Sequence, residues 1–559
     1  MKKKALSALL AGALAVSLLS ACSSNEPQNI SDVSASTADD TSTAATAEAA
    51  PAGAQEMTFV LNNIPDGLDP GVTNNSFAQY VLINCFEGLV TYDESGSLVG
   101  GCAESWDISD DGLVYTFHLR DGLKWSDGTP LTANDFVYSI QRVLTPSTAA
   151  QYVSMVTGYI KNAQEFYDGT ATADDLGVKA IDDQTLEITL IQPTSYFIDV
   201  LSMWVYDPVQ QATVEANGDA WTSSPETYVC NGPFKVTGMS LNENVILEKN
   251  ENYWDAENVT LDKLTFRYIL DNSTALTAYE SGEVDGIISI PSSDYARLKA
   301  EKAGVQVYPS YGTVYYNINC SVAPYDNPLV RKALCLAVDR QSLIDNVVQV
   351  DAEPAYSFLA PGYSVDGKDI TEGRSNYGLS ATADVEAAQA ALAEAGYPNG
   401  EGFPTLQLSY YQDDTVKKIV EAMAEMLKNN LNINVEVSSN EWAIFYEDVQ
   451  QGNYEVAAMG WSADYLNPMS FLPLFKTGDS SNNSFYSNPE YDALVEQVMS
   501  ESDAAKAAEL TMQAADLASN DYCCLPLYYK SNSFLMHDNI SGYYMTASSN
   551  LYFKHVVVS

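Results

Sequence analysis

Residues 124–139 read KWSDGTPLTANDFVYS, and together with the residues before them they indicate the class of fold. Just before it, Tyr115–Arg120 alternates between apolar and polar side chains with the period of a β-strand. Gly128 and Pro130 are turn residues, and Asp135–Val143 has the pattern of an amphipathic helix. A strand, a turn and a helix are therefore expected in succession, as in an α/β protein.

The second half of the chain continues this alternation. Asn327 and Pro328 form a helix start, which predicts a helix through Val330–Val348. Ala383–Ala395 is a second expected helix, because Gly396 and Pro398 follow it as stop signals.

Two further segments of this half predict structure. Thr415–Asn430 carries its apolar side chains on one helical face, and Ile433–Val437 follows as a strand. The turn-rich region around Gly312 separates the strand-like segments Val305–Tyr308 and Tyr315–Asn319. We expect the chain to cross there from one lobe to another.

Length and charge limit the classes of protein to consider. A chain of 559 residues predicts two or three domains. It has 74 acidic and 27 basic side chains and a net charge of −47, so the phosphate backbone of a nucleic acid would be repelled. Nucleic acid is therefore excluded as a partner.

The first 55 residues predict the location. Residues 1–21 have the lysines, the apolar run Ala5–Leu19 and the small residues of a secretory signal peptide. The ending before Cys22 resembles a bacterial lipobox, which implies that Cys22 becomes the lipidated first residue. The alternative is an ordinary cleavage site beside an unrelated cysteine. Residues 22–55 are polar and are expected to form a disordered tether, which would hold the folded part outside the cytoplasm, at the outer face of the cytoplasmic membrane or in the periplasm.

Motifs for catalysis or metal binding are absent from the sequence. It contains no Gly-x-Ser-x-Gly, His-Glu-x-x-His or phosphate-binding loop. Three histidines, and seven further cysteines without a Cys-x-x-Cys pair, do not predict a zinc site. Pairs of neighbouring aspartates are expected to be solvated loops. We therefore expect no enzyme activity, cofactor or metal.

A series of motifs resembles the peptide-binding family of extracytoplasmic solute-binding proteins that serve ABC importers, family 5, and most closely its oligopeptide-binding members. The motifs lie in the family's order over nearly the whole chain after the tether. Besides the opening stretch they are Gly67–Pro70, Phe86–Leu89, Ala103–Trp106, Asn231–Phe234, Asn252–Trp254, Tyr279–Asp285, Arg331–Leu334, Ala391–Tyr397 and Gly460–Tyr465.

This resemblance implies an α/β, two-lobed periplasmic-binding-protein-like fold of type II, with a hinge and an extra inserted domain. Lobe I would comprise residues 56–86, 211–311 and 532–559, the inserted domain 87–210, and lobe II 312–531. Hinges are expected near Gly312 and Asn532. Trp106 and Trp125 are expected to pack the inserted domain rather than contact ligand.

The resemblance also implies a ligand site between the lobes, in which the main chain of a peptide pairs like a strand. Asp464 would receive the α-amino group of the peptide, because a buried amine needs a fixed counter-charge. For three aromatic residues of the expected site, Tyr152, Tyr315 and Trp442, an ordinary core position is the alternative. The other expected contacts are Asn74 and Ser76 in lobe I and Asn317, Gly460, Trp461 and Asn483 in lobe II.

The sequence departs from the best-known pattern of the family at several positions. Gly312 and Ser462 stand where that pattern has a disulfide, so no such bridge forms here. Val449 and Met459 replace two arginines that can receive a peptide carboxylate. Lys530 replaces an aromatic residue; it supplies either a cation near the site or a solvated surface charge.

By this resemblance the chain is expected to capture peptides of mixed sequence, as a monomer, and to deliver them to an ABC permease. Other ligands remain as alternatives: a dipeptide, a signalling peptide, or a nickel chelate, which the few histidines disfavour. An extracellular hydrolase or adhesin on the same fold is the alternative from another class.

Overall fold

The structure is a computed structural model, and it describes residues 55–240, 242–365 and 368–559. The expected signal peptide, the lipidation site Cys22 and the tether up to residue 54 lie outside the described residues.

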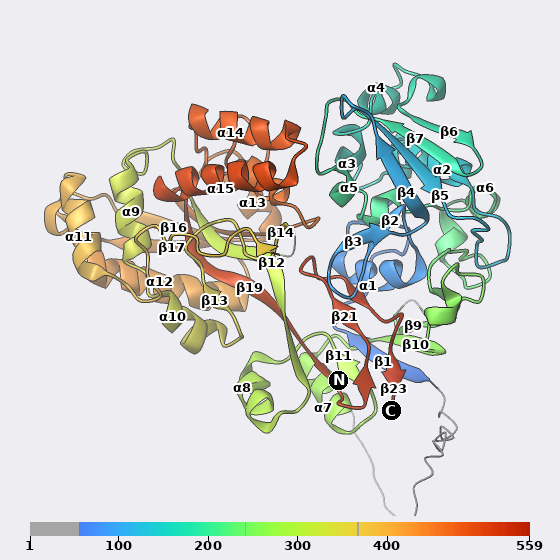
Figure 1. Cartoon of the computed structure of the whole chain (residues 1–559). Helices are drawn as coiled ribbons and strands as arrows, with labels where there is room; N and C mark the ends of the chain where they lie inside the picture. Colours follow the sequence, from blue (N-terminus) through green and yellow to red (C-terminus); the bar gives the residue numbers. More distant parts are fainter. Residues whose placement is uncertain (1–54, 241, 366–367) are drawn as a thin grey trace, which may run out of the picture. The chain divides into compact units, whose positions relative to one another are not determined.

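One eleven-stranded sheet runs through the described chain (Figure 1). Strands from residues 406–462 form one end of it and strands from residues 56–268 the other. The order across the sheet is β17 (Val435–Asn440), β16 (Leu406–Tyr411), β18 (Val456–Ser462), β12 (Val305–Ile318), β19 (Cys524–Met536), β11 (Gly286–Ile287), β1 (Glu56–Leu61), β10 (Lys263–Tyr268), β9 (Asn244–Lys249) and β8 (Phe234–Ser240), with β13 (Glu353–Pro354) also paired to β19.

The two long strands β12 and β19 connect the two ends of this sheet. β12 continues from Val305 to Ile318, so the expected turn around Gly312 is wrong. The reason is that β12 has a partner on each side: Gly312 pairs with Ser462 of β18, and β19 lies along the other edge. The turn-forming residues produce only a shift in register with β19, between Pro309 and Thr313.

A separate antiparallel sheet contains β4 (Ala103–Ile108), β5 (Val114–Leu119), β7 (Thr185–Thr189) and β6 (Val178–Asp182). Helix α2 (Ala133–Val143) packs on it, and its start is a capping box between Thr132 and Asp135. Trp125 is fully buried, and Trp106 is half-buried against Phe117. The expected packing role of both tryptophans is confirmed.

Three helices share one hydrophobic core and confirm part of the helix prediction: α9 (Pro328–Leu336), α11 (Val385–Glu394) and α12 (Asp414–Leu431). The expected continuous helix through residue 348 is wrong, because it ends at Leu336. The buried Arg340 guanidinium donates to the carbonyls of Cys335 and Val338, which a continuous helix would use itself. Asp339 then caps the short α10 (Arg340–Leu343), and a π-helical turn, Ile344–Val348, follows.

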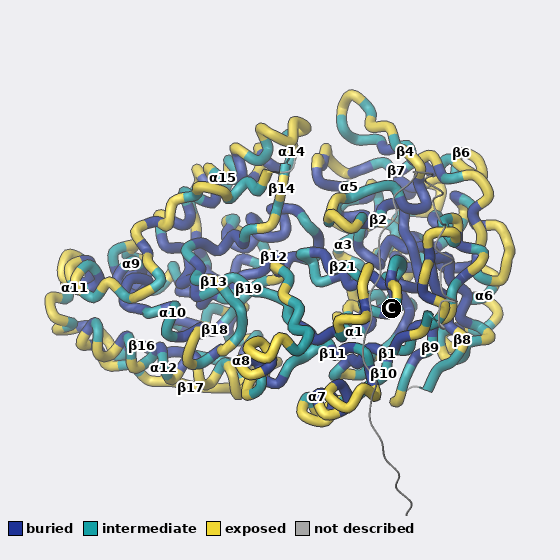
Figure 2. Tube along the Cα trace, turned by 60° about the horizontal axis from the view of Figure 1, so that its bottom comes forward, coloured by how far each residue is buried: buried dark blue, intermediate teal, exposed yellow. Residues whose placement is uncertain are grey.

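Figure 2 shows buried strands β1 and β11, whereas α7, α8 and α11 carry exposed turns. No helix within the described residues is long and apolar enough to cross a membrane. The remaining helices are α1 (Ser76–Cys85), α3 (Ser154–Thr157), α4 (Ala163–Tyr167), α5 (Phe197–Val200), α6 (Gln211–Asn217), α7 (Asn272–Glu280), α8 (Ser292–Glu301), α13 (Trp442–Gln450), α14 (Pro489–Ser500) and α15 (Ala504–Asn520).

The described residues also form four short two-stranded pairs: β2 (Val90–Tyr92) with β3 (Leu98–Gly100), β14 (Ser364–Val365) with β15 (Lys368–Asp369), β20 (Ile540–Ser541) with β23 (Val557–Val558), and β21 (Tyr544–Met545) with β22 (Leu551–Tyr552). The seven described cysteines are free thiols, and all but the half-buried Cys320 are buried.

Candidate ligand-binding site

Strand β18 has one edge that is only partly paired. On one side β12 pairs with all of Val456–Ser462, but on the other side β16 pairs only with Val456 and Ala457. Within the described residues, the part of β18 that contains Gly460 and Trp461 therefore has no strand partner on the β16 side. Unpaired N–H and C=O groups at such an edge can hold an extended peptide chain.

Asp464 lies directly beyond the end of β18. Its main-chain N–H donates to Ser470 Oγ at 3.1 Å, and Trp461 Nε1 donates to the same oxygen at 3.3 Å. Tyr152 Oη donates to Asp464 Oδ1 at 3.4 Å. Burial raises the pKa of Asp464 to about 6. None of the ion pairs in the described chain includes Asp464.

Gln151, which precedes Tyr152 in the chain, forms hydrogen bonds with the segment before α1. The Gln151 N–H donates to Val72 O at 2.9 Å, and the Asn74 N–H donates to Gln151 Oε1 at 3.2 Å. Asn74 lies in a loop and Ser76 is the first residue of α1; both are exposed. The structure thus connects Asn74, through Gln151, to Tyr152 and Asp464, and Ser76 follows Asn74 by two residues.

Tyr315 and Asn317 lie on β12 beside β18, opposite Met459 and Ala457, and both are buried. Asn483 is also buried, and its main-chain oxygen accepts a hydrogen bond from the Tyr454 hydroxyl. These three expected contacts are therefore buried inside the protein.

Trp442 is different, because 48% of it is exposed at the start of α13. Its ring lies 5.0 Å from that of Tyr411 and stacks on Tyr446 at 5.3 Å. Tyr411 ends β16, on the side where the β18 edge is unpaired. These rings offer apolar surface to a ligand at that edge.

Val449 is fully buried and Met459 packs in the same small cluster with Phe445. Both residues supply apolar contacts and no charge. A ligand carboxylate would therefore need a cation from elsewhere.

One buried acid near this region is not part of any motif recognised in the sequence. Asp199 of α5 accepts a hydrogen bond from Asn467 Nδ2 at 3.1 Å, and burial raises the pKa of Asp199 to about 7. Its position in the apolar run Tyr196–Leu201 was the available signal, since an isolated acid in such a run is buried when the segment packs.

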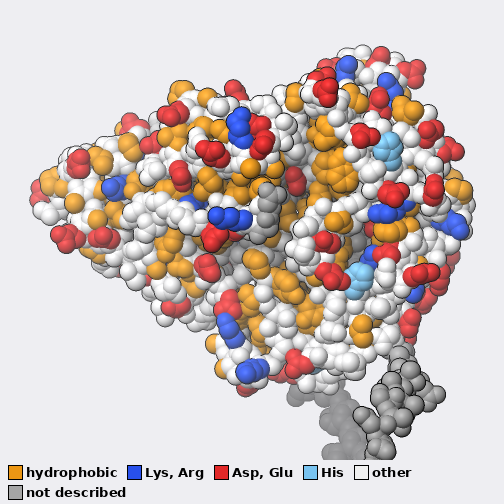
Figure 3. All heavy atoms as spheres, in the orientation of Figure 1, with side chains coloured by type: hydrophobic (Ala, Val, Ile, Leu, Met, Phe, Trp, Pro, Cys, Tyr) orange, Lys and Arg blue, Asp and Glu red, His pale blue; other side chains and the backbone are white. Residues whose placement is uncertain are grey.

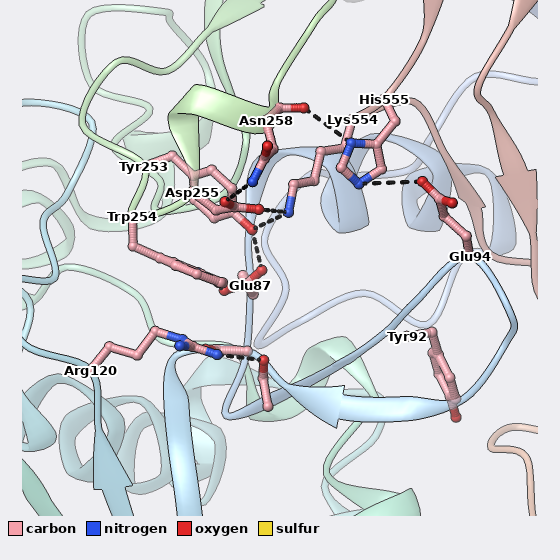
Figure 4. Close-up of polar contacts among 12 residues, drawn as sticks. Glu87, Tyr92, Glu94, Arg120, Tyr253, Trp254, Asp255, Asn258, Lys554 and His555 are labelled. Carbon is pink, nitrogen blue, oxygen red and sulfur yellow. Dashed lines mark hydrogen bonds and ion pairs between the residues drawn. The ribbon is translucent and has the colours of Figure 1, made fainter.

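A second polar cluster has a structural role (Figure 4). The buried Glu87 carboxylate accepts hydrogen bonds from Tyr253 and from Trp254 Nε1, and Arg120 lies 3.8 Å from the centre of the Trp254 ring. Lys554 pairs with Asp255 in the same cluster. Through these contacts Phe86–Leu89 and Asn252–Trp254 join segments that are far apart in the sequence. The adjoining cavity of about 430 Å³ is lined by none of the residues around Asp464.

The described residues contain no group of three or more His, Cys, Asp or Glu that could hold a metal ion. His118 is an exposed strand residue whose Nε2 lies 2.9 Å from Asp107 Oδ2.

A sequence profile of bacterial extracellular solute-binding proteins, family 5, middle part, matches residues 97–483. The chain belongs to this family. It is therefore a solute-binding protein and not an enzyme, as the motifs predicted.

Named relatives agree with the profile. The chain is 33% identical over 509 residues to the oligopeptide-binding protein OppA of Bacillus subtilis, covering 90% of this chain and 92% of that one. It is 37% identical over 524 residues to the periplasmic oligopeptide-binding protein OppA of Salmonella typhimurium, covering 92% and 95%.

Solved structures confirm the type II two-lobed fold. The unliganded open form of the murein tripeptide-binding protein MppA matches with a TM-score of 0.79 and 32% identity, over 91% of this chain and 98% of that one. Haemophilus influenzae OppA in complex with the peptide RPPGFSPFR matches with a TM-score of 0.71 and 32% identity, over 90% and 99%.

Proposed function

We propose that this family 5 protein captures oligopeptides at the outer face of the cytoplasmic membrane and delivers them to an ABC importer. The observation that carries the proposal is the unpaired edge of β18, which ends two residues before the partly buried Asp464. The names of the relatives, which bind oligopeptides or a murein tripeptide, support the same ligand class.

In this proposal the peptide main chain pairs with β18 at Gly460 and Trp461, and its α-amino group forms an ion pair with Asp464. Main-chain groups are the same in every peptide, so pairing of this kind accepts many sequences. Side chains alternate between the two sides of an extended chain, and the rings of Trp442 and Tyr411 would face some of them. Asn74, Ser76 and Tyr152 would complete the site, with Tyr315, Asn317 and Asn483 behind it.

We propose the expected domain boundaries for the same reason: residues 56–86, 211–311 and 532–559 as lobe I, 87–210 as the inserted domain and 312–531 as lobe II. The hinges would lie in β12 near Gly312 and in β19 near Asn532, where the register between the two strands shifts. The N-terminal signal peptide and a lipid on Cys22 would anchor the protein.

Native mass spectrometry of the purified protein tests the ligand class. A set of co-purifying peptides of mixed sequence is the expected result. One defined mass would indicate a single dedicated ligand, such as a signalling peptide, and would contradict broad capture.

Calorimetry tests the amine contact. Acetylating the peptide N-terminus and replacing Asp464 by Ala remove the two halves of one ion pair, so each change should weaken binding and the two losses should not add. A partly buried pair of this kind contributes about 2–5 kcal/mol, so less than a threefold effect from both single changes would place the amine elsewhere.

A further inference from the structure

The side chain of Lys530, on β19, crosses the neighbouring strand β12 and reaches β18. Its Nζ donates to Ser462 Oγ of β18 at 2.9 Å, so its side chain passes over β12. A Cβ added to Gly312 would lie 2.9 Å from Lys530 Cδ, and one added to Gly460 would lie 3.9 Å from Lys530 Cε. The two glycines thus provide the space in which this lysine lies against the sheet.

Among the described residues no carboxylate lies within ion-pair distance of Lys530, although the sequence has 74 acidic side chains. None of the ion pairs in the described ranges includes Lys530. Figure 3 shows how acidic groups outnumber basic ones on the face it displays. The lysine is half-buried, and burial lowers its pKa to about 8. A solvated surface lysine would have water around all three of its donors, whereas here one donor is committed to Ser462.

The position of this ammonium group matters because Ser462 ends the unpaired edge of β18. Ser462 and Gly460 are two residues apart on a strand, so they lie on the same face of the sheet. A peptide that pairs with this edge would project alternate side chains toward that face. Asp464, where the α-amino group of the peptide would lie, is two residues, or about 7 Å of extended chain, beyond Ser462. Only the first few residues of the peptide would therefore come near Lys530.

We infer that Lys530 and Ser462 form a carboxylate subsite, and that the protein prefers peptides that carry a carboxylate within the first three residues. This inference rests on the proposed function, because it takes the peptide to lie along β18. The carboxylate is either an Asp or Glu side chain or, in a very short peptide, the C-terminal group. The site would then carry two opposite charges: Asp464 would bind the α-amino group of the peptide, and Lys530 would bind its carboxylate.

Calorimetry on the full chain, freed of ligand, tests this with matched peptides. Ala-Glu-Ala-Ala and Ala-Gln-Ala-Ala differ only in the side-chain carboxylate, and tri-alanine with a free or amidated C-terminus differs only in the terminal one. The variants are Lys530→Met, which keeps the aliphatic stem, and Lys418→Met, an exposed lysine of α12, as the control.

The expected result is that Lys530→Met weakens the carboxylate-bearing member of at least one pair by about tenfold or more, while its neutral partner changes less than twofold. The pair that responds identifies the source of the carboxylate. Ser462→Ala should weaken the same peptide, and Lys418→Met should change neither. Melting curves check that each variant is folded.

Equal binding of both members of each pair by the wild type and by Lys530→Met would overturn the subsite and leave peptide capture intact. Failure of the wild type to bind any of the four peptides would overturn the proposed function, and the subsite with it.

Discussion

Replacing Asp464 by Asn should make the empty protein more stable and a worse binder. The substitution keeps the shape and the acceptor for the Tyr152 hydroxyl, but removes the charge. Burial raises the pKa of this carboxyl from 3.8 to about 6, so keeping it ionised in the folded protein costs about 3 kcal/mol at pH 7.5. The neutral amide avoids that cost.

The stability cost of the ionised Asp464 carboxylate depends on pH in a definite direction. A carboxyl with a raised pKa is protonated in both the folded and the unfolded state below pH 3.8, so it then costs nothing. The cost grows between pH 4 and pH 6 and is complete above it; at pH 4.5 it is about 1 kcal/mol. The advantage of Asp464→Asn should therefore be largest at neutral pH and fall as the pH is lowered.

Differential scanning calorimetry measures the effect. With about 2.1 cal/mol/K of unfolding entropy per residue, roughly 500 folded residues give about 1 kcal/mol/K, so the melting temperature should rise by about 3 °C at pH 7.5 and by about 1 °C at pH 4.5. Asp110→Asn, in an exposed loop, is the control and should change neither value. The same variant should bind free-amine peptides at least tenfold more weakly. A melting temperature that is unchanged or lower at pH 7.5 would show that Asp464 is solvated and that burial does not raise its pKa.

Three further predictions concern pH and the anchor. Peptide affinity should fall by about tenfold for each pH unit below 6, with release of a proton on binding, because the amine requires ionised Asp464; calorimetry in two buffers of different ionisation enthalpy would detect it, and a constant affinity from pH 5 to 7 would exclude this residue as the anchor. Asp199→Asn should raise the melting temperature more at pH 8 than at pH 5, because the raised pKa of about 7 makes the ionised form costly above it; an equal change at both pH values would contradict that cause. Cys22→Ser should abolish membrane attachment of the processed protein, which cell fractionation would show; a cleaved variant that stays with the membrane would refute lipidation.

Local features of the fold were predictable where the interactions that form them are between residues close together in the sequence. The strand at Tyr115–Arg120 and the helix after Thr132 form as expected, because alternation and a capping box act over a few residues. The break after Leu336 was not predictable, since it depends on Arg340 reaching carbonyls that include Pro526, far along the chain. The continuity of β12 likewise depends on partners on both sides.

The candidate site was likewise predictable only in part. The motif Gly460–Tyr465 pointed to Asp464, but three facts needed the structure. Tyr152 meets this acid from 312 positions away. The free edge exists because β16 stops pairing with β18 after Ala457. Lys530 reaches Ser462 only because Gly312 lies between them.

The strands β12 and β19 have a mechanical consequence. A ladder of backbone hydrogen bonds along two long strands keeps their length and mutual offset constant, while the pair can still bend where its register is irregular. In the proposed opening and closing, one end of the sheet would therefore rotate relative to the other about an axis near Pro309 and Thr313, with little sliding. A covalent crosslink between the two ends, placed away from that axis, would then restrain this rotation without touching the two strands.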